Sequence, residues 1–356
     1  MARKKSEEKL NVPDGHYRRV MKFYAIIGCL FLCLTGCLNN NVRHHTTNEI
    51  SFKDGSSLYP DSRYLTAIGY GNSKSTARLQ AKKELSNIFE STITSQFKHE
   101  THAVRDSNKG NSTSEKIEAI IFIYSQITLK GVQVKALKSE QGQFTALAVL
   151  DKFLAKDNWL LEVNHLDDQM QVEYRNIKKR HSKLLWIKPV QKILHYWMKR
   201  RSIVSCLSVI GFKAPSADIH LKTILNMIAT IKNSLQFHIH ISGVHAKKLS
   251  DHIANALNNT GYIICDSRKA NVLISGNLTV EPSDITNEDW IYRRAIVSLQ
   301  VTDPSTNNQV FNISENLRRG HLTTKAATNK AIKAISIAVQ KQILKIFDPF
   351  KVDSHS

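Results

Sequence analysis

The sequence predicts an α+β protein, in which two small α/β-sandwich-type domains are joined by a basic helical linker. Two observations lead to this prediction. Strand-like and helix-like periodicities alternate in the order β-α-β-β-α over 58–160 and α-β-α-β-β-β-β-α over 216–348. Between them, residues 161–215 are rich in Lys and Arg and have no strand pattern. Residues 349–356 form a short tail. A chain of 356 residues, 42% of them hydrophobic, is long enough for two such domains.

The amino end carries the pattern of an export signal. Residues 23–34 are apolar and follow three basic residues, Arg18, Arg19 and Lys22. A charged start and a short apolar run are typical of a secretory signal. Because a membrane-spanning helix needs about 20 apolar residues, this run is a poor permanent anchor. A plain signal peptide or a short transmembrane helix is the alternative if the cysteine that follows is incidental.

The apolar run ends at Leu34-Thr35-Gly36-Cys37, which resembles a bacterial lipobox. The resemblance implies that the sulfur of Cys37 takes a diacylglyceryl group, that the chain is cut before Cys37, and that the new amine is acylated. We therefore predict a cleaved lipoprotein signal peptide over 1–36, with Met1 or Met21 as its true start. Residues 37–57 are then a lipidated polar tether.

A lipidated Cys37 also predicts where the protein acts. Several acyl chains anchor a protein stably, because each buried methylene contributes about 0.8 kcal/mol. Leu38 follows the cysteine, in place of the Asp that retains lipoproteins at the inner membrane in enteric bacteria. We expect an outer-membrane anchor facing the periplasm. The whole chain has a net charge of +20, and +16 remains after residues 1–36, which carry +4, are removed; in the periplasm this charge favours peptidoglycan, lipopolysaccharide or anionic lipid as contacts over nucleic acid. A basic surface without a specific contact is the alternative.

The first domain is predicted from changes in period. Residues 64–71 alternate as a strand does, and 74–97 carry apolar side chains at helical spacing, with Ser73 as the N-cap. A loop or hairpin arm is expected over 99–116, a strand over 117–137, a break over 138–141 and a paired strand over 144–150. A further helix is expected to begin near Asp151.

The region Tyr59–Trp159 resembles the Lpp-twenty family of outer-membrane lipoproteins. The resemblance rests on Tyr59-Pro60, the strand ending Gly69-Tyr70-Gly71, the helix with its alanines spaced by a turn, and the closing strand Ala146-Leu147-Ala148-Val149. Members occur as lipoproteins and as accessory proteins of the flagellar outer membrane. The resemblance implies a location and a non-enzymatic role, and it brings no catalytic residues.

The linker is expected to be one helix that is interrupted or kinked near Pro189. Residues 174–201 hold ten Lys or Arg and no acid, interleaved with Trp186, Tyr196 and Trp197. Such a helix can lie on an anionic bilayer or pack between domains. A linker helix whose basic face is simply solvated is the plainer alternative.

The second domain is predicted as helix 220–232, strand 235–242, helix 246–258, strands 262–266 and 272–280, a hairpin of 293–302 with 309–317, and a closing helix over 323–347. Gly261 is placed where a left-handed helix stop favours glycine. This order resembles the amino-terminal domain of the Tol–Pal propeller protein, the curli secretion lipoprotein, and the middle domain of flagellar assembly protein T. The resemblance rests on Ala246–Asp266, Ala270–Gly276 and Val297–Asp303.

We predict no catalytic residue, no metal site and no cofactor. Gly69-Tyr70-Gly71 lacks the third glycine of a dinucleotide turn, since Lys74 occupies that position. His238 and His240, with His245 and Cys265 near them, fall short of a zinc ligand set. The pair Asp167-Asp168 is expected to be a solvated acidic pair between helices.

Only Cys206 and Cys265 follow Cys37 in the sequence. The periplasm permits a disulfide between them, and two buried thiols are equally compatible with the sequence.

These patterns predict a non-enzymatic structural or accessory lipoprotein of the outer membrane, which contacts another envelope protein or itself. Support of the flagellar basal body is a narrower version. The alternative is an activator of a periplasmic cell-wall enzyme, or an envelope enzyme, that binds glycan or anionic lipid through its basic surface.

Overall fold

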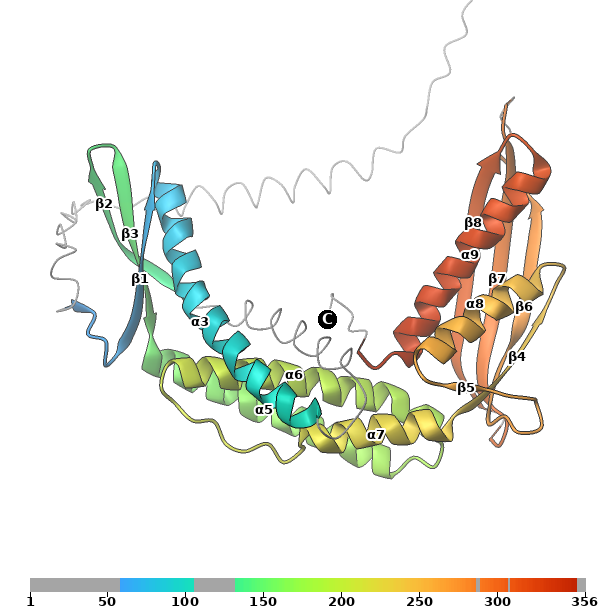
Figure 1. Ribbon diagram of the computed structural model, residues 1–356, viewed down its shortest axis with the longest axis horizontal. Helices are drawn as coiled ribbons and strands as arrows, with labels where there is room; N and C mark the ends of the chain where they lie inside the picture. Colours follow the sequence, from blue (N-terminus) through green and yellow to red (C-terminus); the bar gives the residue numbers. More distant parts are fainter. Residues whose placement is uncertain (1–57, 106–131, 286–288, 307, 351–356) are drawn as a thin grey trace, which may run out of the picture. The chain divides into compact units, whose positions relative to one another are not determined.

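Helices and strands follow one another in the order that the periodicities predict. The computed structural model describes residues 58–105, 132–285, 289–306 and 308–350 (Figure 1). These residues form a three-stranded sheet, a five-stranded sheet and six α-helices, so the predicted α+β class is confirmed. Among them, no helix is both long enough and apolar enough to cross a membrane. All of them belong to one unit, Phe52–Ser356, and the predicted domain borders stay a prediction.

The first sheet has the strand order β1-β3-β2, with every pair antiparallel. It consists of β1 (Tyr64–Gly71), β2 (Gln133–Glu140) and β3 (Gln143–Asp151), and α3 (Lys74–Arg105) packs on it. The backbone N–H of Thr76 donates to Ser73 Oγ at 3.2 Å, as expected of an N-cap.

Two predicted boundaries in this region are wrong. The loop predicted over 99–116 is wrong for residues 99–105, because α3 continues to Arg105 through a stretch without glycine or proline, and the rest of that range lies outside the described residues. The break predicted over 138–141 is narrower, because β2 runs to Glu140 and only Gln141 and Gly142 make the turn. Their φ values of +47° and +81° are those of a two-residue hairpin. The predicted strand 117–137 lies outside the described residues up to position 131.

Glycines in β1 let α3 approach the sheet closely. A Cβ on Gly69 would lie 2.0 Å from the backbone N of Ala81 and 2.6 Å from the backbone O of Ala77. Both alanines are fully buried. The Gly69-Tyr70-Gly71 motif therefore has a packing role, since backbone meets backbone where a side chain would stand.

The linker, predicted as one helix interrupted or kinked near Pro189, is a hairpin of two helices. Helix α5 (Lys152–Lys178) begins at Asp151, whose carboxylate caps Phe153 N and Leu154 N, and α6 (Ile187–Val209) follows a short 3-10 turn, η1 (Lys183–Trp186). The helix is interrupted at 179–182, so the interruption that was one of the two predicted alternatives is present, and it lies before Pro189 rather than at it. Pro189 lies in the first turn of α6, where a missing N–H breaks no helical hydrogen bond.

The second sheet has the strand order β5-β4-β6-β7-β8. Pairing is parallel for β4 with β5 and β6, and antiparallel from β6 to β8. The strands are β4 (Gln236–Ser242), β5 (Ile263–Ile264), β6 (Val272–Pro282), β7 (Ile291–Asp303) and β8 (Asn308–His321). Helix α7 (Leu221–Ser234) precedes them; α8 (Ala246–Asn259) and α9 (Thr324–Phe347) contact each other and pack on the sheet (Figure 1).

This order confirms the prediction α-β-α-β-β-β-β-α. Gly261 has a φ of +87° directly after α8, as its predicted role as a helix stop requires. Alternate residues of β7, from Ala295 to Val301, are buried, which leaves the other face of the sheet polar.

Hydrogen bonds join the α5–α6 hairpin to the second sheet. The side-chain amide of Gln191, in α6, donates to the backbone oxygens of Lys345, Ile346 and Asp348 at 3.3, 2.9 and 3.3 Å. Ser182 Oγ donates to Asp303 Oδ2 at the end of β7. These bonds tie α6 to the end of α9, and the segment before η1 to the end of β7.

The two cysteines of this part of the chain are free thiols, so the disulfide between Cys206 and Cys265 does not form in the structure. Cys206 is fully buried in α6, and burial raises the pKa of its thiol to about 12. Cys265 follows β5, and its Sγ lies 3.9 Å from Gln236 Oε1. A bridge would need Cys206 to leave the core.

Replacing Gly69 by alanine tests the close packing of β1 and α3. We expect the Gly69→Ala variant to lose about 1–3 kcal/mol or more in free energy of unfolding, because the new methyl group meets backbone atoms that cannot rotate away. Urea unfolding followed by circular dichroism measures this loss. Ile68→Val, on the exposed face of the same strand, should change it little. Equal stability of Gly69→Ala and the parent would contradict the packing.

Candidate functional site

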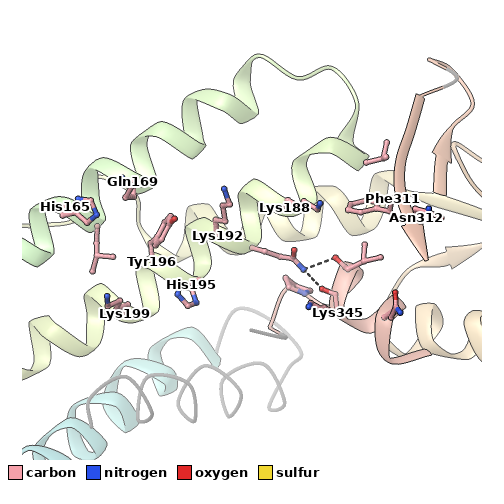
Figure 2. Close-up of a pocket in the computed structure, with 16 residues that line it drawn as sticks. His165, Gln169, Lys188, Lys192, His195, Tyr196, Lys199, Phe311, Asn312 and Lys345 are labelled. Carbon is pink, nitrogen blue, oxygen red and sulfur yellow. Dashed lines mark hydrogen bonds between the residues drawn. The ribbon is translucent and has the colours of Figure 1, made fainter. Parts of the chain in front are cut away.

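A groove with a volume of about 1220 Å³ runs along α6 (Figure 2). Side chains of α5 and α6 form one wall, and residues of β8 and the end of α9 form the other. Its size exceeds the roughly 300–1,000 Å³ of a small-molecule pocket. The groove is therefore better matched to an extended occupant than to a compact one.

A row of basic side chains lies along this groove. Lys188, Lys192, His195 and Lys199 are spaced by four, three and four residues on α6, which places them on one face of the helix. With a rise of 1.5 Å per residue, the row is about 16 Å long. Lys345 of α9 also lines the groove.

Two of these lysines are held by carboxylates of α5. Lys192 Nζ lies 2.7 Å from Glu173 Oε1, and Lys199 Nζ lies 2.7 Å from Glu162 Oε1. The hydrogen bond from Lys192 to Glu173 raises the pKa of Lys192 above its ordinary value, although partial burial opposes this. Lys192 thus stays charged at neutral pH.

Lys188 is positioned by an aromatic ring. Its Nζ lies 5.1 Å from the centroid of Phe311 in β8, a cation–π distance. Phe311 in turn packs edge-on against Phe347 at 5.9 Å between ring centroids. The first lysine of the row is therefore tied to the second sheet.

His195 is the uncharged member of the row at neutral pH. Burial lowers the pKa of its imidazole, and the nearby positive charge of Lys199 lowers it further. The histidine adds polar hydrogen-bonding capacity without a third full charge between Lys192 and Lys199.

The rest of the lining is neutral. Amide side chains at Gln169, Gln191, Asn312 and Gln342 stand among apolar ones, and no described lining residue is Asp or Glu. The apolar part of the lining is Leu166, Tyr196, Val310, Phe311, Ile346 and Pro349. A surface of this kind attracts an anionic partner that also offers some apolar area.

A buried ion pair supports the wall from behind. Arg200, with 7% of its side chain exposed, donates to Asp167 Oδ1 at 2.6 Å and to the backbone O of Pro215 at 2.8 Å. The prediction that Asp167-Asp168 is a solvated pair between helices is wrong for Asp167. Both residues lie within α5, and the carboxylate of Asp167 pairs with the buried guanidinium group of Arg200.

The other predicted residues do not come together as a site. His238 and His240 lie on β4, where His238 Nδ1 is 3.2 Å from the backbone O of Cys265 rather than its sulfur. Within the part of the chain that the structure describes, no cluster of three His, Cys, Asp or Glu side chains could hold a metal ion. Cys37, the predicted lipidation site, lies outside the described residues.

Sequence reasoning missed the groove, because its walls come from segments about 150 residues apart. The sequence does contain part of the pattern that indicates the groove, because the spacing of Lys188, Lys192 and Lys199 places them on one helical face. This spacing could be used only once that face was known to border β8 and α9.

The fold and the groove define an α+β protein with an open surface groove that is lined by lysines. No protein-family model matches the chain, and no curated protein matches it. Among solved structures, a secreted protein of Helicobacter pylori is 12% identical over 79% of this chain and 98% of its own, with a TM-score of 0.40.

Two lipoproteins give shorter matches. A minor lipoprotein of Acinetobacter baumannii is 13% identical over 32% of this chain and 90% of its own, with a TM-score of 0.24. The rare lipoprotein B of Shewanella oneidensis is 17% identical over 32% of this chain and 91% of its own, also with a TM-score of 0.24.

The lowered pKa of His195 predicts a pH dependence of stability. The folded state binds a proton at His195 less readily than the unfolded chain does. The free energy of unfolding is therefore not reduced by His195 above about pH 6.5, the ordinary histidine pKa, where the imidazole is neutral in both states. As the pH falls from about 6.5 to the lowered pKa of the folded state, the unfolded chain takes up the proton first, and the free energy of unfolding decreases. We expect the free energy of unfolding, measured with urea, to fall less between pH 7.5 and pH 5 in the His195→Gln variant than in the parent.

His181→Gln, outside the groove, serves as the control for removal of a histidine. An unchanged pH slope in His195→Gln would show that protonation of this imidazole costs the folded state nothing.

Proposed function

We propose that this chain is a lipid-anchored, non-enzymatic accessory protein of the bacterial envelope that holds another envelope protein in the α6 groove. The observation that carries the proposal is the groove itself. It is open and longer than a small substrate needs, and the described residues line it with four lysines and no carboxylate.

The state of its charged groups favours binding over catalysis. A lysine that acts as a nucleophile or base works with a lowered pKa, because the neutral amine is the reactive form. At Lys192 the hydrogen bond to Glu173 has the opposite effect and raises the pKa. Fixed positive charges in an open groove suit recognition of an anionic surface.

The lipobox at Leu34-Thr35-Gly36-Cys37 supports the anchor in this proposal. Leu38 after the cysteine supports the outer membrane, with the folded part in the periplasm. The resemblance of Tyr59–Trp159 to the Lpp-twenty family agrees with such a place. Nothing in the groove favours flagella over another envelope assembly, and the proposal is therefore not restricted to them.

Lipidation is tested by replacing the proposed acceptor. We expect cells expressing the chain to incorporate radiolabelled palmitate into it and to retain it in the outer-membrane fraction. The Cys37→Ser variant should lose the label and leave that fraction, because no sulfur remains to receive the diacylglyceryl group. The control variant Cys33→Ser alters a cysteine that Thr-Gly does not precede, and it should keep the palmitate label and stay in the outer-membrane fraction. Label that persists in Cys37→Ser would refute the anchor.

The binding role is tested by crosslinking in cells followed by recovery of the chain. We expect at least one envelope protein to be recovered with the parent and depleted with the Lys188→Gln, Lys199→Gln double variant. Lys222→Gln with Lys325→Gln removes the same charge from exposed positions on α7 and α9 and should leave recovery unchanged. Identical recovery with both double variants would exclude the groove as the contact.

A further inference from the structure

We infer that the occupant of the α6 groove is an acidic segment of the partner protein, with carboxylates along one side and an apolar residue near its end. The inference rests on the proposed function, because it names the chemistry of the partner that the groove would hold. It is argued from the order of the charges, their exposure, and the apolar surface beside them.

The cations form a line rather than a cluster. Along α6, Lys188 and Lys192 are about 6 Å apart in rise, and Lys192 and Lys199 about 10 Å. Carboxylates one and two turns apart on a partner helix, or on alternate residues of an extended segment, repeat at comparable distances. A single phosphate group would instead be held best by cations that converge on one point.

The lysines keep capacity for a second anion. The side chain of Lys192 remains 57% exposed although it contacts Glu173, which is only 13% exposed. Lys199 remains 36% exposed beside Glu162. Since an ammonium group has three donors, one carboxylate of α5 does not saturate it.

Lys188 has no carboxylate partner among the described residues. Its contact is the face of Phe311, which orients the ammonium group without neutralising it. An incoming carboxylate would therefore find its least compensated charge at this end of the row.

Apolar side chains lie at the same end. Val310 and Ile346 are half-buried, and Pro349 and Phe311 are buried behind them. They offer room for one apolar side chain of the partner next to its acidic one. An acidic amphipathic segment satisfies both features, whereas a purely polar polyanion leaves this surface uncovered.

Binding is measured by fluorescence anisotropy with the full chain in a non-ionic detergent. The probe is a fluorescein-labelled helical peptide of about sixteen residues, with Glu at every fourth position and two leucines on the adjoining face. The control peptide carries Gln in place of each Glu. We expect saturable binding of the acidic peptide only, weakening as salt is raised because the contact is electrostatic.

The groove is located with the same two double variants. Lys188→Gln with Lys199→Gln should weaken binding of the acidic peptide on the order of tenfold, since two charges of the row are lost while a polar, uncharged side chain remains at each position. Lys222→Gln with Lys325→Gln should leave it within twofold. Circular dichroism and urea unfolding confirm that all variants fold.

Three results would overturn the inference: equal binding of the Glu and Gln peptides, equal weakening by both double variants, and displacement of the peptide by short-chain phosphatidylglycerol but not by unlabelled peptide. The last would assign the groove to lipid head groups. Failure of the proposed lipid anchor gives a different result. In that case the Cys37→Ser variant would still incorporate palmitate, while peptide binding in detergent would be intact.

Discussion

The burial of α6 is the constraint on which the rest of the structure depends. This helix contacts α3, α5, α7 and α9, and its buried face includes Trp197, Met198, Ile203 and Leu207. It belongs to the most basic stretch of the chain. Because an isolated buried charge is costly, the helix can occupy the core only if its cations are paired or directed outward.

Both solutions are present, and together they create the groove. Asp167 pairs with the buried Arg200, while Glu162 and Glu173 hold Lys199 and Lys192 at the rim. The acids absent from 174–201 are thus supplied by the preceding helix. Other lysines of the segment lie over aromatic rings, as Lys178 does over Tyr174 and Lys183 over Trp186. Tyr174 and Trp186 are therefore part of how the fold accommodates the charge of this stretch.

Local patterns predicted the elements well and their assembly poorly. Alternation in β1, the cap at Ser73 and the stop at Gly261 act within a few residues, so the sequence displays them directly. The sequence predicts an interruption or a kink near Pro189 but not the hairpin of α5 and α6, because the first turn of a helix tolerates proline and the turn lies before it. The groove could not be predicted, since no local pattern indicates that α6 borders β8 and α9. The pairing of Asp167 with Arg200 was missed for the same reason.

The amide of Gln191 has a consequence for the order of folding. Its three acceptors lie at the carboxyl end of α9, more than 150 residues further along the chain. Contacts between such distant segments slow folding, because the intervening chain must first be brought into place. The α5–α6 hairpin can form from segments that are adjacent in the chain. The contacts of α6 with α9 must wait until the last helix has been made, and in that interval the side of α6 that meets α9 is exposed to other molecules, such as a chaperone.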